Sequence, residues 1–343
     1  SKLIIMDEPT SALNKNETAN LFKIIRSLRQ QEVAIIYISH KMDEIFDITD
    51  RITVMRDGRV IDTKLTKDFT HKEIVVMMTG KDLSDDYFAK EGAAPPSDHG
   101  QETPILSVRN ISSSARNLKS VSFDLYKGEV LGIAGLLGAG RTELFKAIFG
   151  ADRMTGGEIP LNGAPVRIGS TIDAVRAGIM LLPEDRKTEG LILQMSIQDN
   201  IIEPSLKAIS TAGLVSRKKG KALAKEYTAR MRVKCTGEEQ VVGNLSGGNQ
   251  QKVVFAKWLA AHPKVLMLDD PTRGIDVGSK HEIYGLIREL ANQGIGVIFV
   301  SSEMPELVGV CDRVLVMRDG EIVSEAVGAA INDNHLMMIA TGT

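Results

Sequence analysis

Val130-Leu-Gly-Ile-Ala134 followed by Gly135-Leu-Leu-Gly-Ala-Gly-Arg-Thr142 is the stretch that decides the fold. The first five residues predict a buried β-strand, and a helix is expected over 143–149. The glycines have the spacing of a phosphate-binding loop, G-x-x-x-x-G-[K]-[ST]. Such a loop turns backbone N–H groups toward phosphate oxygens, and the N-terminus of the next helix adds partial positive charge. The stretch therefore predicts a phosphate site, with the Thr142 hydroxyl available to Mg²⁺.

Arg141 departs from this pattern, which has lysine at its position. A planar guanidinium is bulkier than an ammonium and reaches the β- and γ-phosphate oxygens differently. The competing interpretation is a glycine-rich turn between strand and helix that binds nothing. The apolar strand before the loop and the helical pattern after it favour the phosphate loop.

The chain also contains an internal repeat. At an offset of 262 residues, Asp7-Glu-Pro-Thr10 falls on Asp269-Asp-Pro-Thr272, and residues 51–58 fall on 313–320. Agreement over about sixty positions indicates that one fold unit occurs twice. Each copy alternates short apolar strands with helices, which predicts an α/β fold with a parallel sheet and right-handed crossovers.

The two copies differ in completeness. A length of 343 residues suggests two domains. Some 160 residues precede the acidic turn in the second copy but only six in the first, so we expect the first copy to be part of a domain. Residues 93–104 are rich in turn-forming residues and predict a linker. The expected organisation is the C-terminal half of a first domain at 1–80, a linker at 81–104 and a second domain at 105–343.

Composition excludes several classes of protein. Lys and Arg number 42 against 44 Asp and Glu, so the chain is not a nucleic-acid coat or a polybasic membrane binder. Two cysteines do not make a disulfide framework in a chain of this length, which fits a reducing cytosol. No apolar run approaches the roughly 18 residues of a membrane span, and the first residues do not resemble a signal peptide. A membrane role is therefore expected to depend on a partner.

A second anion site is expected at Leu245-Ser-Gly-Gly-Asn-Gln-Gln251, where a helix over 250–261 begins. The Ser246 hydroxyl and the N–H groups after it are suited to bind an anion. Taken alone, Ser-Gly-Gly is more often a plain helix cap. Its place between the phosphate loop and an apolar strand that ends at Asp269 favours the anion site.

Taken together, these features resemble the ATPase subunits of ABC transporters over nearly the whole chain. Pro271-Thr-Arg-Gly-Ile-Asp-Val-Gly278, Pro183-Glu-Asp-Arg-Lys187 and the Gly-Arg-Thr of the loop are similar to the duplicated subunit of bacterial monosaccharide importers of the ribose, galactose and xylose type. The resemblance implies a P-loop NTPase fold with a parallel-rich central sheet, an antiparallel β subdomain and a helical subdomain, with the first copy incomplete. It also implies an ATP-hydrolysing subunit that uses ATP and Mg²⁺.

The same resemblance implies partners and a location. Two membrane-spanning permease subunits would bind the ATPase, and a periplasmic sugar-binding protein would act through the complex, without nucleic acid. The subunit would be peripheral, on the cytoplasmic face of the inner membrane. Residues 185–203 are expected to contact the permease, because the run Leu191–Met195 is apolar. A buried strand and loop of the domain itself would explain this apolar run equally well. The basic run 216–221 is expected to be the start of a solvated helix.

In this family each ATP lies between the phosphate loop of one domain and the LSGG segment of the other. For the first copy, the resemblance implies that Asp7 holds Mg²⁺ through water and that Glu8 orients or deprotonates the attacking water. It also implies that His40 is the switch histidine at the γ-phosphate. These three residues would belong to the competent site.

In the second copy the matching positions are Asp269, Asp270 and Ser302, and Glu184 replaces the glutamine that senses Mg²⁺. Asp270 is one methylene shorter than the usual glutamate, and serine cannot take up a proton as histidine does. The family usually has an aromatic residue upstream of the loop that stacks on adenine, and residues 106–121 contain none, so this site is expected to be degenerate. The other residues expected to contact nucleotide are Gly135, Gly138, Gly140, Arg141, Thr142, Ser246, Gly247, Gly248, Gln250 and Asp276.

Other classes of function explain the sequence less well. A ribosome-associated duplicated ABC ATPase is expected to have a long charged linker and a basic surface, whereas this chain has a short linker and a net charge of −2. A DNA-repair ABC ATPase would need a long coiled coil after the phosphate loop, and no sustained heptads occur there. An inactive truncated fragment is a third alternative, because the sequence starts inside a predicted strand. The transported sugar is not encoded in any recognisable motif.

Overall fold

The computed structural model describes residues 1–10, 13, 15–39, 41–56, 58–79, 102–113 and 117–342. The chain divides into two compact units. Of the described residues, one unit contains 1–79 and 274–281, and the other contains 102–273 and 282–342. The linker predicted at 81–104 lies outside the described residues except for 102–104, and so does His40.

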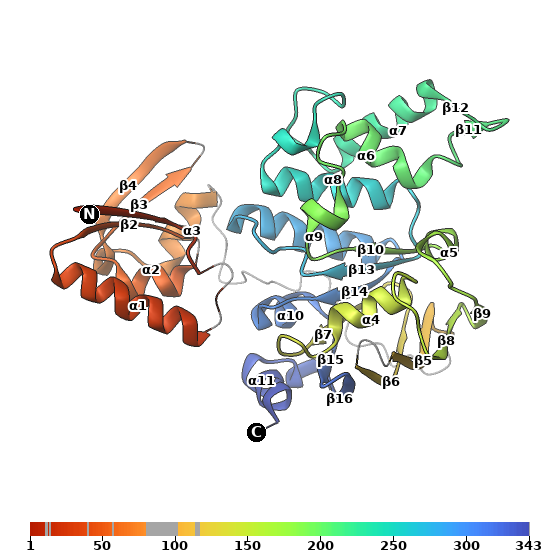
Figure 1. The fold of residues 1–343 in the computed structure, drawn as a ribbon. Helices are drawn as coiled ribbons and strands as arrows, with labels where there is room; N and C mark the ends of the chain where they lie inside the picture. The colour runs from red at the N-terminus through yellow and green to blue at the C-terminus, as the bar shows by residue number, and fades with distance from the viewer. Residues whose placement is uncertain are drawn as a thin grey trace. The chain divides into compact units, whose positions relative to one another are not determined.

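The larger unit is built around a six-stranded sheet with the strand order β10-β13-β14-β7-β15-β16 (Figure 1). Its strands are β7 (Val130–Ala134), β10 (Ile179–Leu182), β13 (Val265–Asp269), β14 (Gly296–Val300), β15 (Arg313–Arg318) and β16 (Glu321–Val327). All neighbours are parallel except β15 and β16. Every residue of β7, β10, β13 and β14 is buried, as expected for apolar strands covered on both faces. The predicted parallel-rich sheet is confirmed.

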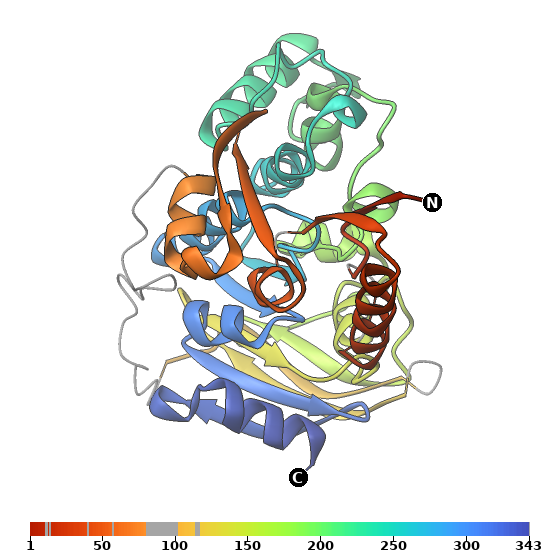
Figure 2. The ribbon, with the colours of Figure 1, turned by 90° about the vertical axis from the view of Figure 1, so that its left-hand side faces the viewer.

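Two further parts complete this unit. Strands β5 (Leu106–Ser113), β6 (Leu118–Leu125), β8 (Gly156–Leu161) and β9 (Ala164–Val166) form an antiparallel sheet. Helices α6 (Ile197–Ile202), α7 (Arg217–Arg230) and α8 (Gly247–Leu259) pack together as a layer at one end of the unit (Figures 1 and 2). These are the expected antiparallel and helical subdomains. The other helices are α4 (Arg141–Ile148), α5 (Thr171–Ala177), α9 (Val277–Asn292), α10 (Met304–Val310) and α11 (Asp333–Thr341).

Helix starts in the helical layer show how well the sequence locates them. The Ser216 hydroxyl accepts a hydrogen bond from the Lys219 N–H at 3.4 Å and begins α7, which confirms the predicted helix start there. Helix α8 begins at Gly247, three residues before the predicted start at Gln250. Glycine disfavours a helix interior, but the first turn tolerates it because its N–H groups have no partner within the helix.

The smaller unit has two separate two-stranded sheets. Strands β1 (Leu3–Asp7) and β2 (Ala34–Ile38) pair in parallel, and β3 (Arg51–Arg56) pairs antiparallel with β4 (Arg59–Leu65). Their counterparts in the larger unit, β13 to β16, belong to one sheet because β7 bonds to both β14 and β15. Within the described part of the smaller unit, no strand occupies the place of β7.

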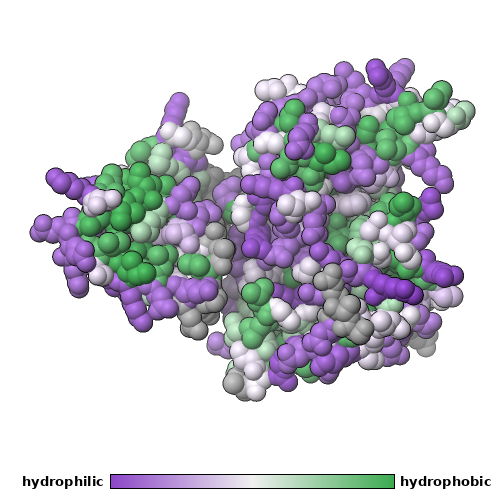
Figure 3. Space-filling view, viewed as in Figure 1, coloured by the Kyte–Doolittle hydropathy of each residue, from purple (hydrophilic) through white to green (hydrophobic). Residues whose placement is uncertain are grey.

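Apolar side chains of β1 and β2 are consequently exposed, unlike those of β13 and β14. Leu3 is 51% exposed, Ile5 63% and Ile36 48%. Figure 3 shows apolar side chains gathered on this face of the smaller unit.

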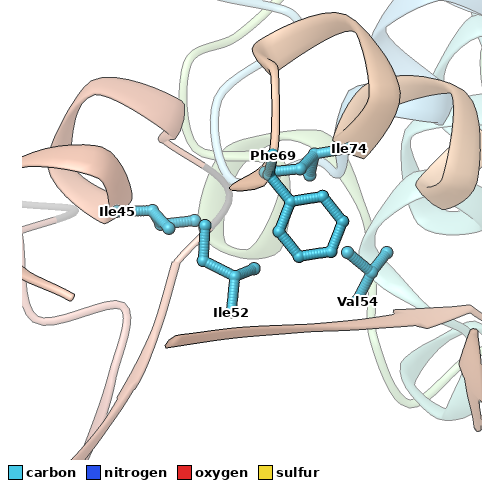
Figure 4. Packing of buried hydrophobic residues seen from close by; sticks show 5 residues of the cluster. All are labelled: Ile45, Ile52, Val54, Phe69 and Ile74. Carbon is cyan, nitrogen blue, oxygen red and sulfur yellow. The ribbon is translucent and has the colours of Figure 1, made fainter. Parts of the chain in front are cut away.

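The smaller unit has its own apolar core beneath β3. Helix α2 (Met42–Ile48), the turn η1 (Thr66–Asp68) and helix α3 (His71–Thr79) lie around it, while helix α1 (Lys15–Gln30) contacts β2 and α2. Figure 4 shows the buried cluster, which consists of Ile45, Ile52, Val54, Phe69 and Ile74. Burial of these side chains stabilises the packing of β3 against α2 and α3.

The two equivalent Asp-Gly turns give a matched test of the packing at the phosphate loop. Gly58 and Gly320 both have positive φ, 75° and 82°. A Cβ at Gly58 meets nothing within 4 Å, whereas one at Gly320 overlaps the carbonyl oxygen of Asn117. Gly58→Ala should therefore cost about 1 kcal/mol of backbone strain, and Gly320→Ala about 1–3 kcal/mol more through overpacking. Urea denaturation of both variants measures the difference, and equal losses would contradict the packing at Gly320.

Candidate nucleotide-binding site

The phosphate loop connects β7 to α4 in the way that its glycines predict. Gly138 and Gly140 have φ values of 83° and 101°, which only glycine adopts readily. Gly135 has no space for a side chain, because a Cβ there would lie 2.7 Å from the carbonyl oxygen of Met317. The loop is thus a tight strand-to-helix turn whose backbone approaches its surroundings closely.

Arg141 fixes this loop to the end of a neighbouring strand. Its Nη1 donates a hydrogen bond to the backbone oxygen of Ser301 at 2.9 Å, immediately after β14. Burial lowers the pKa of Arg141, and the nearby charges of Asp270 and Asp269 act in the opposite direction. The guanidinium is therefore held between the phosphate loop, the acidic pair and the end of β14.

Asp269 is the last residue of β13 and is 3% exposed. Burial raises its pKa to about 6, and a hydrogen bond with the Thr142 side chain partly offsets the increase. The neighbouring carboxylate of Asp270 adds to the increase by repulsion. The structure thus joins Thr142 and Asp269, the two second-copy residues expected at a metal ion.

Asp270 follows in a left-handed backbone conformation with φ 47°. Its N–H donates to the backbone oxygen of Val300 at 3.0 Å, and its side chain bonds to Ser302. Burial raises the pKa of Asp270, and the bond to Ser302 lowers it. The structure therefore brings together Arg141, Thr142, Asp269, Asp270 and Ser302 at the carboxyl ends of β7, β13 and β14.

Glu184 lies just after β10 and forms an ion pair with Arg273. The backbone oxygen of Arg273 also accepts a hydrogen bond from Arg186 at 2.8 Å. This segment is thereby joined to the turn that follows Asp270. The sequence did not reveal that Glu184 has a cationic partner.

The predicted LSGG segment is the start of α8. Ser246 is exposed and accepts a hydrogen bond from the Asn249 side chain at 2.9 Å, and Gly247 and Gly248 form the first turn. Gln250 is 5% exposed, and its amide donates to the backbone oxygen of Leu245 at 3.2 Å. Ser246 is thus available at the surface, while Gln250 fixes the loop before the helix.

The first-copy residues Asp7 and Glu8 are at the end of β1 in the smaller unit. Glu8 repeats the conformation of Asp270, with φ 42° and an N–H bonded to the backbone oxygen of Ile38 at 2.9 Å. Asp276 directly precedes α9, and its carboxylate accepts hydrogen bonds from the N–H and the hydroxyl of Ser279. The prediction for His40 lies outside the described residues.

One buried acidic residue near the site was missed by the sequence analysis. Glu306 of α10 is 1% exposed. Its carboxylate accepts hydrogen bonds from the hydroxyl of Thr272, which follows the acidic pair, and from the hydroxyl of Ser301, which precedes the switch position. Its counterpart at the 262-residue offset is Glu44, which is 8% exposed. The repeat alignment contained this signal, since the glutamate and two of its hydroxyl partners occur in both copies.

Known proteins with similar sequences indicate the family of this chain. A family model described as ABC transporter matches residues 118–273. The chain is 48% identical over 341 residues to the ribose import ATP-binding protein RbsA of Lactococcus lactis subsp. cremoris (strain SK11), covering 99% of this chain and 68% of that protein. The chain belongs to the family of ABC transporter ATP-binding subunits. The family expected from the sequence is confirmed.

Other members and solved structures agree with this assignment. The chain is 46% identical to a ribose import ATP-binding protein, RbsA 2, of Rhizobium meliloti (strain 1021), covering 99% of this chain and 65% of the relative. A nucleotide-free ATP-binding cassette from an ABC transporter matches with a TM-score of 0.58 at 20% identity, over 68% of this chain and 95% of the cassette. The cbiO1 structure from Clostridium perfringens gives a TM-score of 0.55 at 24% identity, over 66% and 89% of the two chains. These structures share the fold of the ABC ATPases, as expected.

None of the helices in the described part of the chain combines the length and apolar character that a membrane span requires. The described residues contain no group of three or more His, Cys, Asp or Glu side chains arranged to hold a metal ion.

Asp269→Asn tests the electrostatics of the acidic pair. The pKa of Asp269 in the folded chain, about 6, lies above the ordinary 3.8, so the folded state binds the proton more tightly than the unfolded state. Its ionisation therefore destabilises the fold increasingly as pH rises from about 4 to about 6. The asparagine variant should be more stable than wild type by on the order of 1–3 kcal/mol above pH 6, and equal near pH 4.

Urea denaturation in the presence of a chelator at several pH values measures this difference. If the stability difference between Asp269→Asn and wild type is the same at pH 4 and pH 8, burial does not raise the pKa of Asp269.

Proposed function

We propose that the chain is the ATP-hydrolysing part of an ABC importer for a monosaccharide, with one competent and one degenerate ATP site. The convergence of Arg141, Thr142, Asp269 and Asp270 at the carboxyl ends of adjacent parallel strands is the observation that carries the proposal. Ligands of open parallel sheets bind at such an edge. The relatives named as ribose import proteins favour ribose or a similar sugar.

Within the second-copy site, the loop glycines would receive the ATP phosphates through backbone N–H groups. The Thr142 hydroxyl and the Asp269 carboxylate are bonded to each other and offer oxygen atoms, the donors that Mg²⁺ prefers. Thr142 and Asp269 would hold the ion, Asp7 doing so in the first copy. Bound with ATP, Mg²⁺ supplies positive charge that neutralises the phosphate oxygens. The remaining predicted contacts, Gln250 included, stay predictions.

The degenerate character of the second-copy site is proposed from the surroundings of Asp270. Its short carboxylate already bonds to Ser302 and lies near the charge of Arg141. A carboxylate engaged in this way is poorly placed to orient a water molecule. The first copy has the longer Glu8 in the same backbone conformation, and with His40 it would serve the competent site.

The proposed assembly follows from the family. Two permease subunits, a periplasmic sugar-binding protein and a peripheral position on the cytoplasmic face of the inner membrane are proposed for the working complex. The chain spans about two thirds of the length of the relatives described above, so the boundaries at 80 and 104 and the completeness of the first domain also stay predictions.

Residues 185–203 are the proposed permease contact. Leu191 is 6% exposed, whereas Ile192 and Met195 are 42% and 46% exposed, so only part of the apolar run belongs to the core. Lys257 of α8 anchors the segment at two points, because its Nζ bonds to the Gly190 backbone oxygen at 3.3 Å and, at the end of the segment, to Glu203 at 2.9 Å. An anchored segment with exposed apolar side chains is suited to transmit movement of α8 to a partner.

Cysteine crosslinking in the assembled transporter tests this surface. A cysteine at Gln194, which is exposed within the segment, should crosslink to a permease subunit. A cysteine at the exposed Lys225 of α7 is the control and should not. Failure of Gln194→Cys to crosslink under conditions that report other permease contacts would remove the proposed role of the segment.

The assignment of the two ATP sites is tested in the full-length subunit with its membrane partners. Glu8→Gln should abolish most steady-state ATPase activity, because orienting the attacking water is a large part of phosphoryl-transfer catalysis. Asp270→Asn should have a much smaller effect. A larger loss from Asp270→Asn than from Glu8→Gln would reverse the assignment.

A further inference from the structure

A buried carboxylate next to the second-copy site accepts hydrogen bonds from three hydroxyl groups. Glu306, in α10, accepts hydrogen bonds from Thr272 Oγ1 at 2.7 Å, from Ser301 Oγ at 2.6 Å and from the Tyr284 hydroxyl at 2.6 Å. The four residues are between 0% and 7% exposed. Buried hydrogen bonds to a charged group are among the stronger ones, and removing one partner leaves a costly unpaired group.

The first copy repeats the three hydroxyl contacts with a tyrosine from another position, and it adds a cation, since Lys41 Nζ lies 3.3 Å from the Glu44 carboxylate where the second copy has Glu303. Glu44 bonds to Thr10 Oγ1 at 2.8 Å, to Ser39 at 3.4 Å and to the Tyr37 hydroxyl at 2.7 Å. Thr10, Ser39 and Glu44 are the counterparts of Thr272, Ser301 and Glu306, but Tyr37 is not the counterpart of Tyr284.

The tyrosine comes from a different element in each copy. Tyr284 is on helix α9, where the first copy has Phe22, and Tyr37 is on strand β2, where the second copy has Phe299. At these two positions each copy therefore has one phenylalanine and one tyrosine. The tyrosine hydroxyl bonds to the equivalent glutamate in both copies, from the strand in the first copy and from the helix in the second. The two copies preserve the hydrogen bond and not the position of the residue that makes it.

The carboxylate holds two loops that carry site residues. Thr272 is two residues after Asp270, and Ser301 is directly before Ser302. Ser301 also accepts at its backbone oxygen from Arg141 and at its hydroxyl from the N–H of Glu303. One side chain thus joins the acidic turn, the switch position and the anchor of the phosphate loop.

The backbone of the acidic turn needs such support. Asp270 and Glu8 have φ values of 47° and 42°, a backbone conformation that residues other than glycine rarely adopt. Strain of this kind persists only where the surrounding structure determines it. In both copies the strained residue bonds through its N–H to the end of the next strand, and the buried glutamate binds residues on both sides of that bond.

We infer that Glu306 and Tyr284, and Glu44 and Tyr37 in the first copy, are positioning residues for the ATP sites. Through Thr272 and Ser301, Glu306 and Tyr284 hold the strained Asp270 and the switch position Ser302 in register at the γ-phosphate end of the second-copy site. Through Thr10 and Ser39, Glu44 and Tyr37 hold the strained Glu8 in the first copy. The inference rests on the proposed function, because it takes Asp270 and Ser302 to lie at that end.

The exchange between copies supplies a rescue experiment. Calorimetric titration of the chain with Mg-ATP and with Mg-ADP is compared among wild type, Glu306→Gln, Tyr284→Phe and the double variant Tyr284→Phe/Phe299→Tyr. Tyr284→Phe should weaken Mg-ATP binding by about tenfold and Mg-ADP binding by less than about twofold, since the lost hydrogen bond supports residues at the γ-phosphate end of the site and ADP has no γ-phosphate. Glu306→Gln should weaken Mg-ATP binding at least as much, again with a smaller effect on Mg-ADP binding. The double variant moves the hydroxyl to its first-copy position and should restore Mg-ATP binding.

The outcomes separate the inference from the function beneath it. If wild type binds neither nucleotide, the proposed second-copy nucleotide site is wrong, and the inference falls with it. If wild type binds both, but Tyr284→Phe weakens them equally or the folded double variant restores nothing, the positioning role is wrong. Should the double variant melt far below wild type, Thr272→Val gives the answer, since it removes a hydroxyl and keeps the shape. An unchanged ratio of ATP to ADP affinity in that variant would also overturn the inference.

Discussion

The larger unit depends on β7 being hydrogen-bonded on both edges. It pairs with β14 on one side and β15 on the other, and so joins strands that come from different parts of the chain. Because all three are parallel, the loop after β7 lies beside the residues that follow β14. Arg141 can therefore reach the Ser301 carbonyl. The smaller unit shows the contrast, since β1–β2 and β3–β4 are separate sheets there and apolar side chains of β1 and β2 are exposed.

Much of this arrangement was readable from the sequence, and particular residues show why. Runs of apolar residues bounded by Gly or Asp identified β7, β13 and β14, because strands buried on both faces need no polar side. The glycines of the phosphate loop and the Asp269–Asp270 pair fixed the edge at which the site lies. The antiparallel subdomain and the grouping of helices into a helical subdomain came from the family resemblance, although the sequence itself predicted helices at α7 and α8.

Burial and partner choice were not readable. Glu306 in a short helix has the pattern of a surface residue, and only the tertiary fold buries it among hydroxyls. Glu184 was identified as a departure from the family, but its pairing with Arg273 joins residues that are far apart in the sequence. Gln250 matched a nucleotide-contacting position, and the structure places its amide against the carbonyl of Leu245. In each case the environment of a polar group depends on chain segments that local patterns do not bring together.

The tyrosine exchange has a consequence for the history of the duplicated gene. Similar repeats within one gene can recombine, and a crossover between the codons for the helix and strand positions would mix the two arrangements. One product would join Phe22 to Phe299 and leave the carboxylate without a phenolic hydroxyl. The reciprocal product would join Tyr284 to Tyr37 and crowd two hydroxyls onto one acceptor. The helix and strand positions are therefore constrained as a pair, because a change at one position that is not matched at the other removes the phenolic hydroxyl or duplicates it.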